Sequence, residues 1–188
     1  MENSLHAFLR IISDGRPLTP GFMTELYPCT DCVRYRKGEY WLGRGRRNPE
    51  IAFIMEGSAM SFRFEENTQN VTNLWNTNEV IIEGSTLLPT RHQDDRVIFL
   101  EDSEVLVLAV RDIEKLQAEF ADARYLVNQM MVKNLLRMEA LYYLMKFQPP
   151  KLRLEHTIEK YAKPFNLLTA VQKASYLGIS KQSFYNLL

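Results

Sequence analysis

The middle of the chain, from about residue 33 to residue 110, consists of short segments in which hydrophobic residues are consecutive or alternate with polar ones. β-Branched and aromatic residues are frequent in these segments, and turn-forming residues separate them,. A spacing of roughly ten residues from one segment to the next is typical of an all-β barrel or sandwich. The expected strands are 33–36, 39–42, 51–55, 59–64, 71–75, 80–82, 96–100 and 105–110.

Hydrophobic residues change to a helical spacing on both sides of this β region,. Before it, helices are expected over 4–12 and 20–27, the second with Pro20 at its start,. After it, Asp112 is expected to cap a short helix that ends at Phe120,. A long helix is then expected over 122–147.

The long helix carries apolar residues on more than one side. One set, spaced alternately by four and three residues, has the a/d spacing with which two helices pack along a seam. A helix that is apolar nearly all round must be covered on several sides. The β region covers one side, and a second copy of the helix is the simplest cover for the other; the alternative is a helix wholly inside the core of one chain. The predicted dimer seam is Val127, Met131, Asn134, Met138, Leu141 and Met145, with Asn134 setting the register,.

Pro149 and Pro150 end the long helix, because proline cannot continue the helical hydrogen-bond ladder,. Beyond them, a helix over 152–161 is expected, then a break at Pro164, and then two short helical stretches separated by residues 177–180. We therefore divide the chain into residues 1–121, 122–148 and 149–188.

The two last stretches have the pattern of a helix-turn-helix. Ala174 is small where two helices would cross, Gly178 lies at the turn, and Leu177, Ile179, Phe184 and Leu187 supply apolar contacts,. In this motif the first residues of the second helix face base edges in the major groove of DNA. The alternative is a helical hairpin that serves only for packing. The predicted DNA-binding residues are Ser180, which can also cap the second helix, Lys181, Gln182, Ser183, Tyr185 and Asn186.

Composition and charge narrow the class of protein. With 188 residues, 46% hydrophobic, 11% aromatic and 24% charged, the chain is an ordinary globular protein and not a disordered, collagen-like or coiled-coil chain,. It lacks an apolar run of the ~18 residues that a membrane helix needs and a signal peptide, so we expect a cytoplasmic protein without membrane partners. Residues 149–188 contain six basic and two acidic residues, whereas the rest contains 17 basic and 21 acidic ones. A basic tail suits nucleic-acid binding, although ordinary helical domains share it.

Four segments in this order resemble the Crp/Fnr family of bacterial transcription regulators: residues 37–39 (KGE), 53–58 (FIMEGS), 100–108 (LEDSEVLVL) and 174–180 (ASYLGIS). The chain looks most like the divergent members of Bacteroidetes-type bacteria. The resemblance implies an α+β fold: a double-stranded β-helix (a jelly-roll-like, cyclic-nucleotide-binding β-roll), a long dimerisation helix and a small all-α helix-turn-helix domain. It implies DNA, a second copy of the chain and RNA polymerase as partners.

The nucleotide-binding motifs of that family are altered in this chain. The family holds ribose with a Gly-Glu pair and the cyclic phosphate with the arginine of an Arg-Ser/Thr-Ala motif; this chain has Ile82 and Glu83 at the first and Gln93 to Asp95 at the second. Gln93 lacks the charge of an arginine, and Asp94 and Asp95 repel phosphate. Cyclic AMP is therefore not expected to bind, and no cofactor is identified; another effector remains open. The residues of this degenerate pocket are Glu83, Gly84, Ser85, Arg91, Gln93, Asp94 and Arg96.

The sequence contains few residues that indicate metal binding, redox chemistry or catalysis. Cys29 and Cys32 have C-x-x-C spacing, but two cysteines do not complete a zinc site; they are either a redox pair or ordinary reduced thiols,. No local pattern of a nucleophile with a base, of paired carboxylates or of a phosphate-binding loop is present, so we do not expect an enzyme. The prediction is a Crp/Fnr-type DNA-binding regulator that does not respond to cyclic AMP. The alternative is an interaction protein that keeps the fold without sequence-specific DNA binding.

Overall fold

The computed structural model describes residues 2–42, 50–66, 68–82 and 96–188. Within these ranges, eight strands form two antiparallel four-stranded sheets. The first sheet has the order β1 (Thr30–Tyr35), β8 (Ser103–Ala109), β3 (Glu50–Glu56) and β6 (Val80–Ile81). The second has the order β2 (Tyr40–Leu42), β7 (Arg96–Phe99), β4 (Ala59–Glu65) and β5 (Thr68–Trp75). Each strand expected from the alternating pattern is confirmed, with ends shifted by up to three residues.

The inner faces of the two sheets share one core. Strand β3 pairs with β8 so that Ala52 lies opposite Val107, and β4 pairs with β7 so that Ala59 lies opposite Phe99. A side chain points to alternate faces along a strand, so each strand sends every second residue inward. The inward residues are almost completely buried: Ala52, Ile54, Ala59, Trp75, Ile81, Val97, Phe99 and Val105, with Trp41 and Val107 slightly less so.

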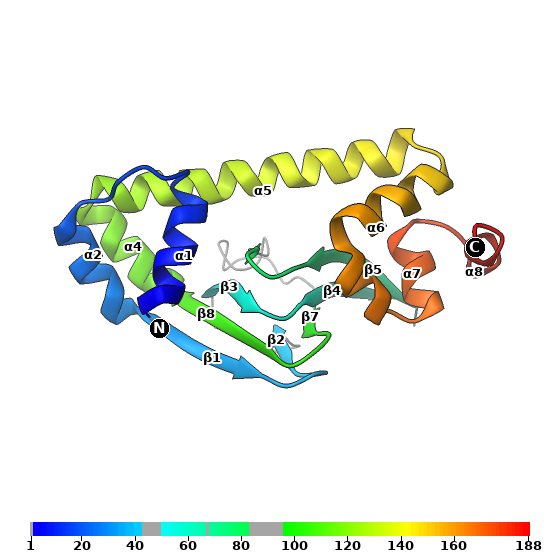
Figure 1. Ribbon diagram of the computed structural model, residues 1–188, viewed down its shortest axis with the longest axis horizontal. Helices are drawn as coiled ribbons and strands as arrows, with labels where there is room; N and C mark the ends of the chain where they lie inside the picture. The colour runs from blue at the N-terminus through cyan, green and yellow to red at the C-terminus, as the bar shows by residue number, and fades with distance from the viewer. Residues whose placement is uncertain (1, 43–49, 67, 83–95) are drawn as a thin grey trace.

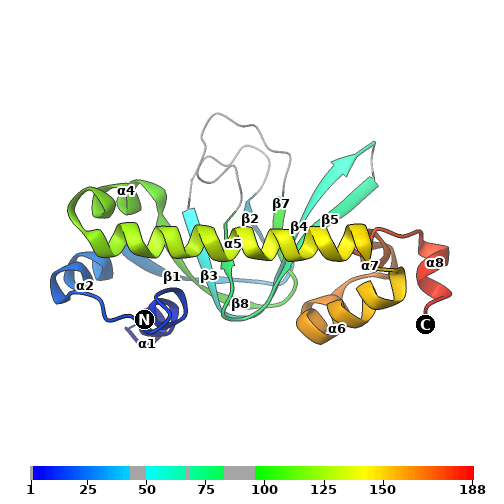
Figure 2. The ribbon, with the colours of Figure 1, turned by 90° about the horizontal axis from the view of Figure 1, so that it is seen from above.

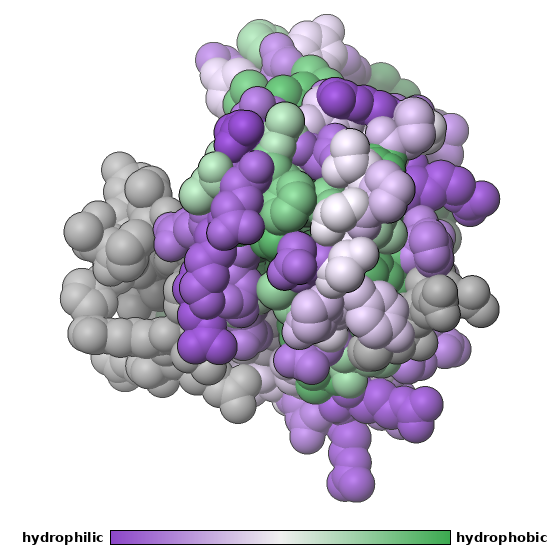
Figure 3. All heavy atoms as spheres, turned by 90° about the vertical axis from the view of Figure 1, so that its left-hand side faces the viewer, coloured by the Kyte–Doolittle hydropathy of each residue, from purple (hydrophilic) through white to green (hydrophobic). Residues whose placement is uncertain are grey.

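Helices cover one end of the sheets (Figure 1). They are α1 (Glu2–Ile12), α2 (Pro20–Leu26), the 3-10 turn η1 (Tyr27–Cys29) and α4 (Val110–Glu119). Phe8 and Phe22 are buried there with Phe53 of β3 and Leu126 of the long helix. Seen from this end, hydrophilic side chains (purple) lie on both sides of hydrophobic ones (green) near the centre of the view (Figure 3). The cap predicted at Asp112 is wrong, because α4 begins two residues earlier and its N-cap is Ala109.

The long helix α5 (Ala121–Phe147) runs the length of the molecule, from α4 to the C-terminal helices (Figure 2). Its first turn is fixed by Asp122, whose Oδ2 accepts hydrogen bonds from the Thr19 amide at 2.8 Å and the Thr19 hydroxyl at 2.6 Å. It ends at Phe147, with Gln148 as its C-cap before the two prolines, as the sequence predicts. Across the described part of the chain, no helix is long and apolar enough to cross a membrane.

The C-terminal helices are α6 (Pro150–Leu167), α7 (Ala170–Tyr176) and α8 (Lys181–Tyr185). The helix predicted over 152–161 with a break at Pro164 is confirmed in part. The backbone leaves helical geometry at Tyr161, with φ −125° and ψ 33°, and a second helical stretch that contains Pro164 follows within α6. Proline has no amide hydrogen, so Pro164 cannot donate to the carbonyl of Lys160 one turn earlier. The side-chain amide of Asn76, just beyond β5, donates to that carbonyl at 2.8 Å. A contact from the residue that follows β5 thus replaces the bond that proline removes at the kink.

Candidate nucleic-acid interface and its supporting helices

Hydrogen bonds at the helix starts define the α7–α8 pair. Thr169 precedes α7 and forms a capping box with Gln172: its hydroxyl accepts from the Gln172 amide, and its own amide donates to the Gln172 side chain,. Ser180 precedes α8, and its Oγ accepts from the amide of Ser183 at 3.0 Å, as predicted,. Between the helices, Gly178 has φ +65°, a left-handed conformation that glycine adopts without strain,. These local signals fix where each short helix begins.

The apolar residues predicted to join the two helices do so. Ala174, Leu177 and Phe184 are almost fully buried in one cluster, and Ile179 and Leu187 are partly buried against it. Phe184 is the inward residue of α8, so the neighbouring positions of this short helix face solvent. The packing therefore holds α8 with one side outward.

The outward side of α8 carries five of the six predicted DNA-binding residues. Lys181, Gln182, Ser183, Tyr185 and Asn186 are exposed and lie within one turn and a half of helix. The Gln182 side chain donates to that of Asn186 at 3.3 Å, and the Lys181 ammonium lies 5.9 Å from the centre of the Tyr185 ring. This surface offers amide donors and acceptors beside a single positive charge, a set that can bind base edges and a phosphate.

Helix α7 is docked on strand β5, which sequence reasoning missed. The Val71 amide donates to the Ser175 hydroxyl at 3.0 Å, and the Gln172 side chain donates to that of Gln69 at 3.2 Å. Burial at this contact raises the pKa of Tyr176 well above its ordinary value,. The tail and the second sheet share one hydrophobic core here, comprising Met60, Phe62, Val71 and Leu74 together with Leu154, Tyr161, Phe165, Leu168, Ala174, Tyr176, Leu177 and Phe184.

The six residues of the predicted dimer seam lie in two different surroundings. Val127 packs against the core under α1 and α2, while Leu141 and Met145 pack against the core of the tail. Asn134 is half-buried, and Met131 and Met138 are exposed. The exposed apolar residues of α5 centre on a neighbouring line of the helix: Met131, Leu135, Met138 and Tyr142, with Val132, Leu136, Tyr143 and Phe147 beside them.

Most of the predicted ligand pocket, Glu83, Gly84, Ser85, Arg91, Gln93 and Asp94, lies outside the described residues. Arg96 is described: it lies on β7, half-buried, with its guanidinium carbon 4.7 Å from the centre of the Phe64 ring. Trp41 and Trp75 are buried between the sheets.

The two cysteines are free thiols. The Cys32 thiol donates to the Glu104 carboxylate at 3.0 Å, and the Cys29 thiol donates to the Glu25 carbonyl at 3.3 Å. Burial raises the pKa of both thiols, and for Cys32 the hydrogen bond to Glu104 adds to the rise. A raised pKa lowers the fraction of reactive thiolate, which disfavours a redox role. In the part of the chain that the structure describes, no group of His, Cys, Asp and Glu could hold a metal ion.

Several solved structures share this fold. FixK2 from Bradyrhizobium japonicum matches with a TM-score of 0.66 at 15% identity, over 84% of this chain and 82% of that one. The c-di-GMP responsive global regulator CLP from Xanthomonas campestris matches with a TM-score of 0.67 at 14% identity, over 90% of each chain. A protein from Eubacterium rectale assigned to the crp/fnr family of transcriptional regulators matches with a TM-score of 0.70 at 11% identity, over 90% of this chain and 82% of that one.

No protein-family model and no curated protein matches the chain. At these identities, the likeness to solved structures establishes the fold: antiparallel sheets combined with several helices, arranged as in these three proteins. The mixed α and β architecture expected from the sequence is confirmed in this coarse form.

Proposed function

We propose that this protein is a dimeric, DNA-binding transcription regulator of the Crp/Fnr type. The observation that carries the proposal is the outward face of α8, where α7 and the shared core hold five exposed polar and aromatic side chains together at one end of the molecule. The α7–α8 pair then serves as a helix-turn-helix, with α8 entering the major groove. Solved structures of the same fold include transcription regulators, which adds support.

Each exposed residue of α8 has a role that its chemistry allows. Gln182 and Asn186 suit adenine, whose major-groove edge offers one donor and one acceptor to a side-chain amide. Their mutual hydrogen bond at 3.3 Å is exchanged for bonds to the base. Lys181 suits a phosphate or guanine, and Ser183 and Tyr185 suit phosphate. Ser180 supports the helix, because its hydroxyl is already engaged in the cap.

A second copy of the chain is the proposed cover for the exposed side of α5. Met131, Leu135, Met138 and Tyr142 follow one another at intervals of four, three and four residues, which is the spacing of a two-helix seam,. A two-fold dimer through this face brings two α8 helices to one DNA molecule, so the operator is expected to contain two symmetric half-sites. Of the six seam residues predicted from the sequence, the proposed seam keeps Met131 and Met138. Its other two residues are Leu135 and Tyr142, which the sequence prediction did not include.

The regulator is proposed not to respond to cyclic AMP. Gln93 stands where the family has a phosphate-binding arginine,. Among the described residues, the space between the sheets is filled by large side chains such as Trp41, Trp75 and Phe99, and Arg96 lies over Phe64. The proposal therefore rests on the residue types at positions 93–95, and the effector is one other than a cyclic nucleotide, or none,.

The test is to incubate the purified protein with sheared genomic DNA of the source organism at about 0.1 M salt and to sequence what is retained. A two-fold-symmetric enriched site is expected. Gln182→Ala should then relax the preference at one base pair in each half-site, at a cost of about 1–3 kcal/mol per bidentate contact. Lys181→Gln should lower the slope of log affinity against log salt by about 1 per half-site. Lys151→Gln, an exposed lysine at the start of α6, is the matched control and should leave binding unchanged.

One observation favours the alternative, an interaction protein without an operator. Helix α8 has five residues and a single positive charge, so it offers few phosphate contacts,. Salt-sensitive retention without any enriched sequence, unchanged in Gln182→Ala, would contradict the proposal and support this alternative.

A further inference from the structure

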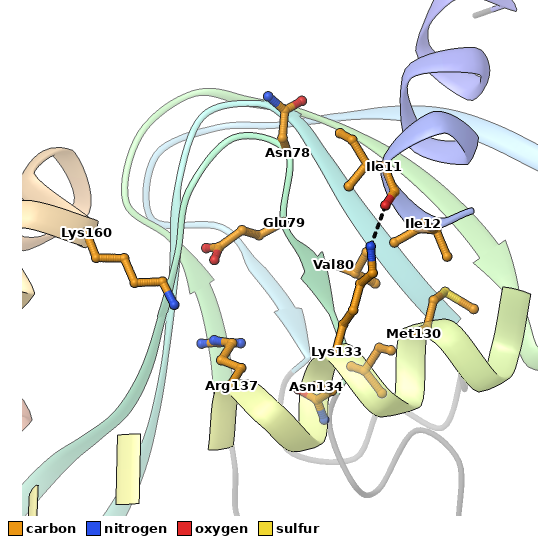
Figure 4. Close-up of a pocket in the computed structure, with 11 residues that line it drawn as sticks. Ile11, Ile12, Asn78, Glu79, Val80, Met130, Lys133, Asn134, Arg137 and Lys160 are labelled. Atoms are coloured by element: carbon orange, nitrogen blue, oxygen red, sulfur yellow. Dashed lines mark hydrogen bonds between the residues drawn. The ribbon is translucent and has the colours of Figure 1, made fainter. Parts of the chain in front are cut away.

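A cavity of about 240 Å³ lies where α1, α5, α6 and the turn between β5 and β6 meet. In Figure 4 the side chains of Glu79, Arg137 and Lys160 point toward the same space, while Lys133 donates to the backbone of α1. Ile82, which stands at the glycine of the family's Gly-Glu pair, is part of the lining, but its side chain is apolar. The charged residues of the lining, Glu79, Lys133, Arg137 and Lys160, are not among those that the family resemblance assigns to a nucleotide.

Arg137 is held rigidly at the wall of this cavity. Its Nη2 donates to the carbonyl of Leu74 at 2.8 Å, its Nε donates to the Tyr161 hydroxyl at 3.3 Å, and its guanidinium lies over the Trp75 ring at 4.9 Å. The residue is half-buried. Among the described residues, no carboxylate lies within 4.0 Å of it to form an ion pair. A guanidinium shielded from water without a counter-ion favours an anion beside it.

Lys160 is brought to the same space by the kink of α6. Asn76 donates its side-chain amide to the Lys160 carbonyl at 2.8 Å, and its backbone amide donates to the Glu79 carboxylate at 2.7 Å. The turn and the helix are thus fastened together next to the cavity. The Lys160 ammonium lies 5.2 Å from the Tyr161 ring centre and, within the described residues, pairs with no carboxylate.

The charges that line the cavity leave it positive. Lys133 is neutralised by Asp14, with 2.5 Å between Nζ and Oδ1. Glu79 is the only acidic residue of the described lining, and it faces two cations, Arg137 and Lys160. Its carboxylate already accepts from Asn76 and, at 3.5 Å, from the Tyr161 hydroxyl. One positive charge therefore remains without a counter-charge in the described wall.

We propose that this cavity binds a small oxyanion, a phosphate or carboxylate group, between Arg137 and Lys160. The volume equals that of about eight water molecules, at roughly 30 Å³ each, and is below the ~300–1,000 Å³ of pockets for larger ligands. The bound anion joins α5, α6 and the β5–β6 turn. Because α6 carries α7 and α8, the anion stabilises the docked position of the C-terminal helices. The site does not depend on whether the chain binds DNA.

The test is thermal unfolding of the full chain at pH 7.5 in increasing sodium phosphate, compared with sodium chloride of equal ionic strength. A saturable rise of the melting temperature in phosphate but not in chloride is expected, since a ligand that binds only the folded state stabilises it. Succinate at the same ionic strength distinguishes a carboxylate ligand from a phosphate one. Equal curves in phosphate, succinate and chloride would overturn the proposal.

Variants localise the effect. Lys160→Gln should weaken anion binding at least tenfold, and Lys160→Arg should retain the binding of the unchanged protein. Lys151→Gln, on the same helix but away from the cavity, should behave as the unchanged protein. Arg137→Gln is a poorer first choice, because Arg137 also supports Leu74 and Tyr161. An anion effect that survives Lys160→Gln undiminished would place binding elsewhere and refute the site. As an independent readout, phosphate should slow amide hydrogen exchange in α6 of the unchanged protein but not of Lys160→Gln.

Discussion

The two halves of helix α5 are both rich in apolar residues, yet their surroundings differ completely. In the first half, Ala123, Leu126 and Met130 are buried under α1, α2 and α4, and Asp122 is buried with them. In the second half no residue is fully buried, and Leu135 is 67% and Phe147 59% exposed. The first half is covered by the helices at its own end of the chain, whereas the second half is covered by the tail only at positions such as Leu141 and Met145 and leaves other apolar residues exposed. Hydrophobicity alone therefore does not tell which side of such a helix the chain itself covers.

The largest effect is expected from removing a side chain of the covered half. Leu126→Ala leaves a cavity in the core around Phe8 and Phe53, and should lower the free energy of unfolding by about 2–5 kcal/mol,. Urea unfolding followed by circular dichroism measures this. Leu136→Ala is the control in the exposed half, where the side chain is 57% exposed, and should cost less than about 1 kcal/mol,. Equal losses would show that the two halves are not different in the way described.

The next effect concerns association rather than folding. Leu135→Glu places two carboxylates opposite each other across the proposed two-fold axis, and should weaken the dimer by about 100-fold or more. Sedimentation equilibrium measures the dissociation constant, and circular dichroism should show unchanged helix content. Ile158→Glu, at a 47% exposed position of α6, is the matched control and should leave the dimer intact. A chain that is monomeric at high concentration, or a Leu135→Glu variant that dimerises normally, would contradict the proposed seam.

The strands and the start of α8 were predictable because their signals are local. The apolar pattern over 59–64 predicts a strand, and β4 spans Ala59–Glu65,. Ser180 was recognised as a cap from its chemistry and position, and it caps α8. Such signals act within a few residues, so one sequence contains them in full.

Contacts between distant segments were not predictable in the same way. The hydrogen bond from Val71 to Ser175 joins residues 104 positions apart, and the sequence of neither segment indicates that it contacts the other. The Asn76 side-chain amide that binds the Lys160 carbonyl at the kink of α6 likewise comes from another part of the chain. The seam residues Leu141 and Met145 have the correct spacing for a partner helix, but the tail of their own chain covers them. The spacing of apolar residues indicates which side of the helix is to be covered. Which segment or chain covers it depends on the tertiary structure.

The smallest expected effect tests how the covered half of α5 begins. The two hydrogen bonds from Thr19 hold the pKa of the Asp122 carboxyl below its ordinary value, and Arg16 at 4.0 Å acts in the same direction,. A depressed pKa means that this group stabilises the fold above the pKa of the unfolded chain, about 3.9, and that the contribution is lost as the pH falls through the lower value of the folded state. Asp122→Asn should therefore cost about 1–2 kcal/mol at pH 7, as hydrogen bonds to a charged group do, and less at pH 3. Urea unfolding at both pH values measures the difference. Asp31→Asn, at an exposed position of β1, is the control and should change the free energy of unfolding little at either pH. If Asp122→Asn lowers that free energy equally at pH 3 and at pH 7, the charge of Asp122 does not stabilise this end of the helix.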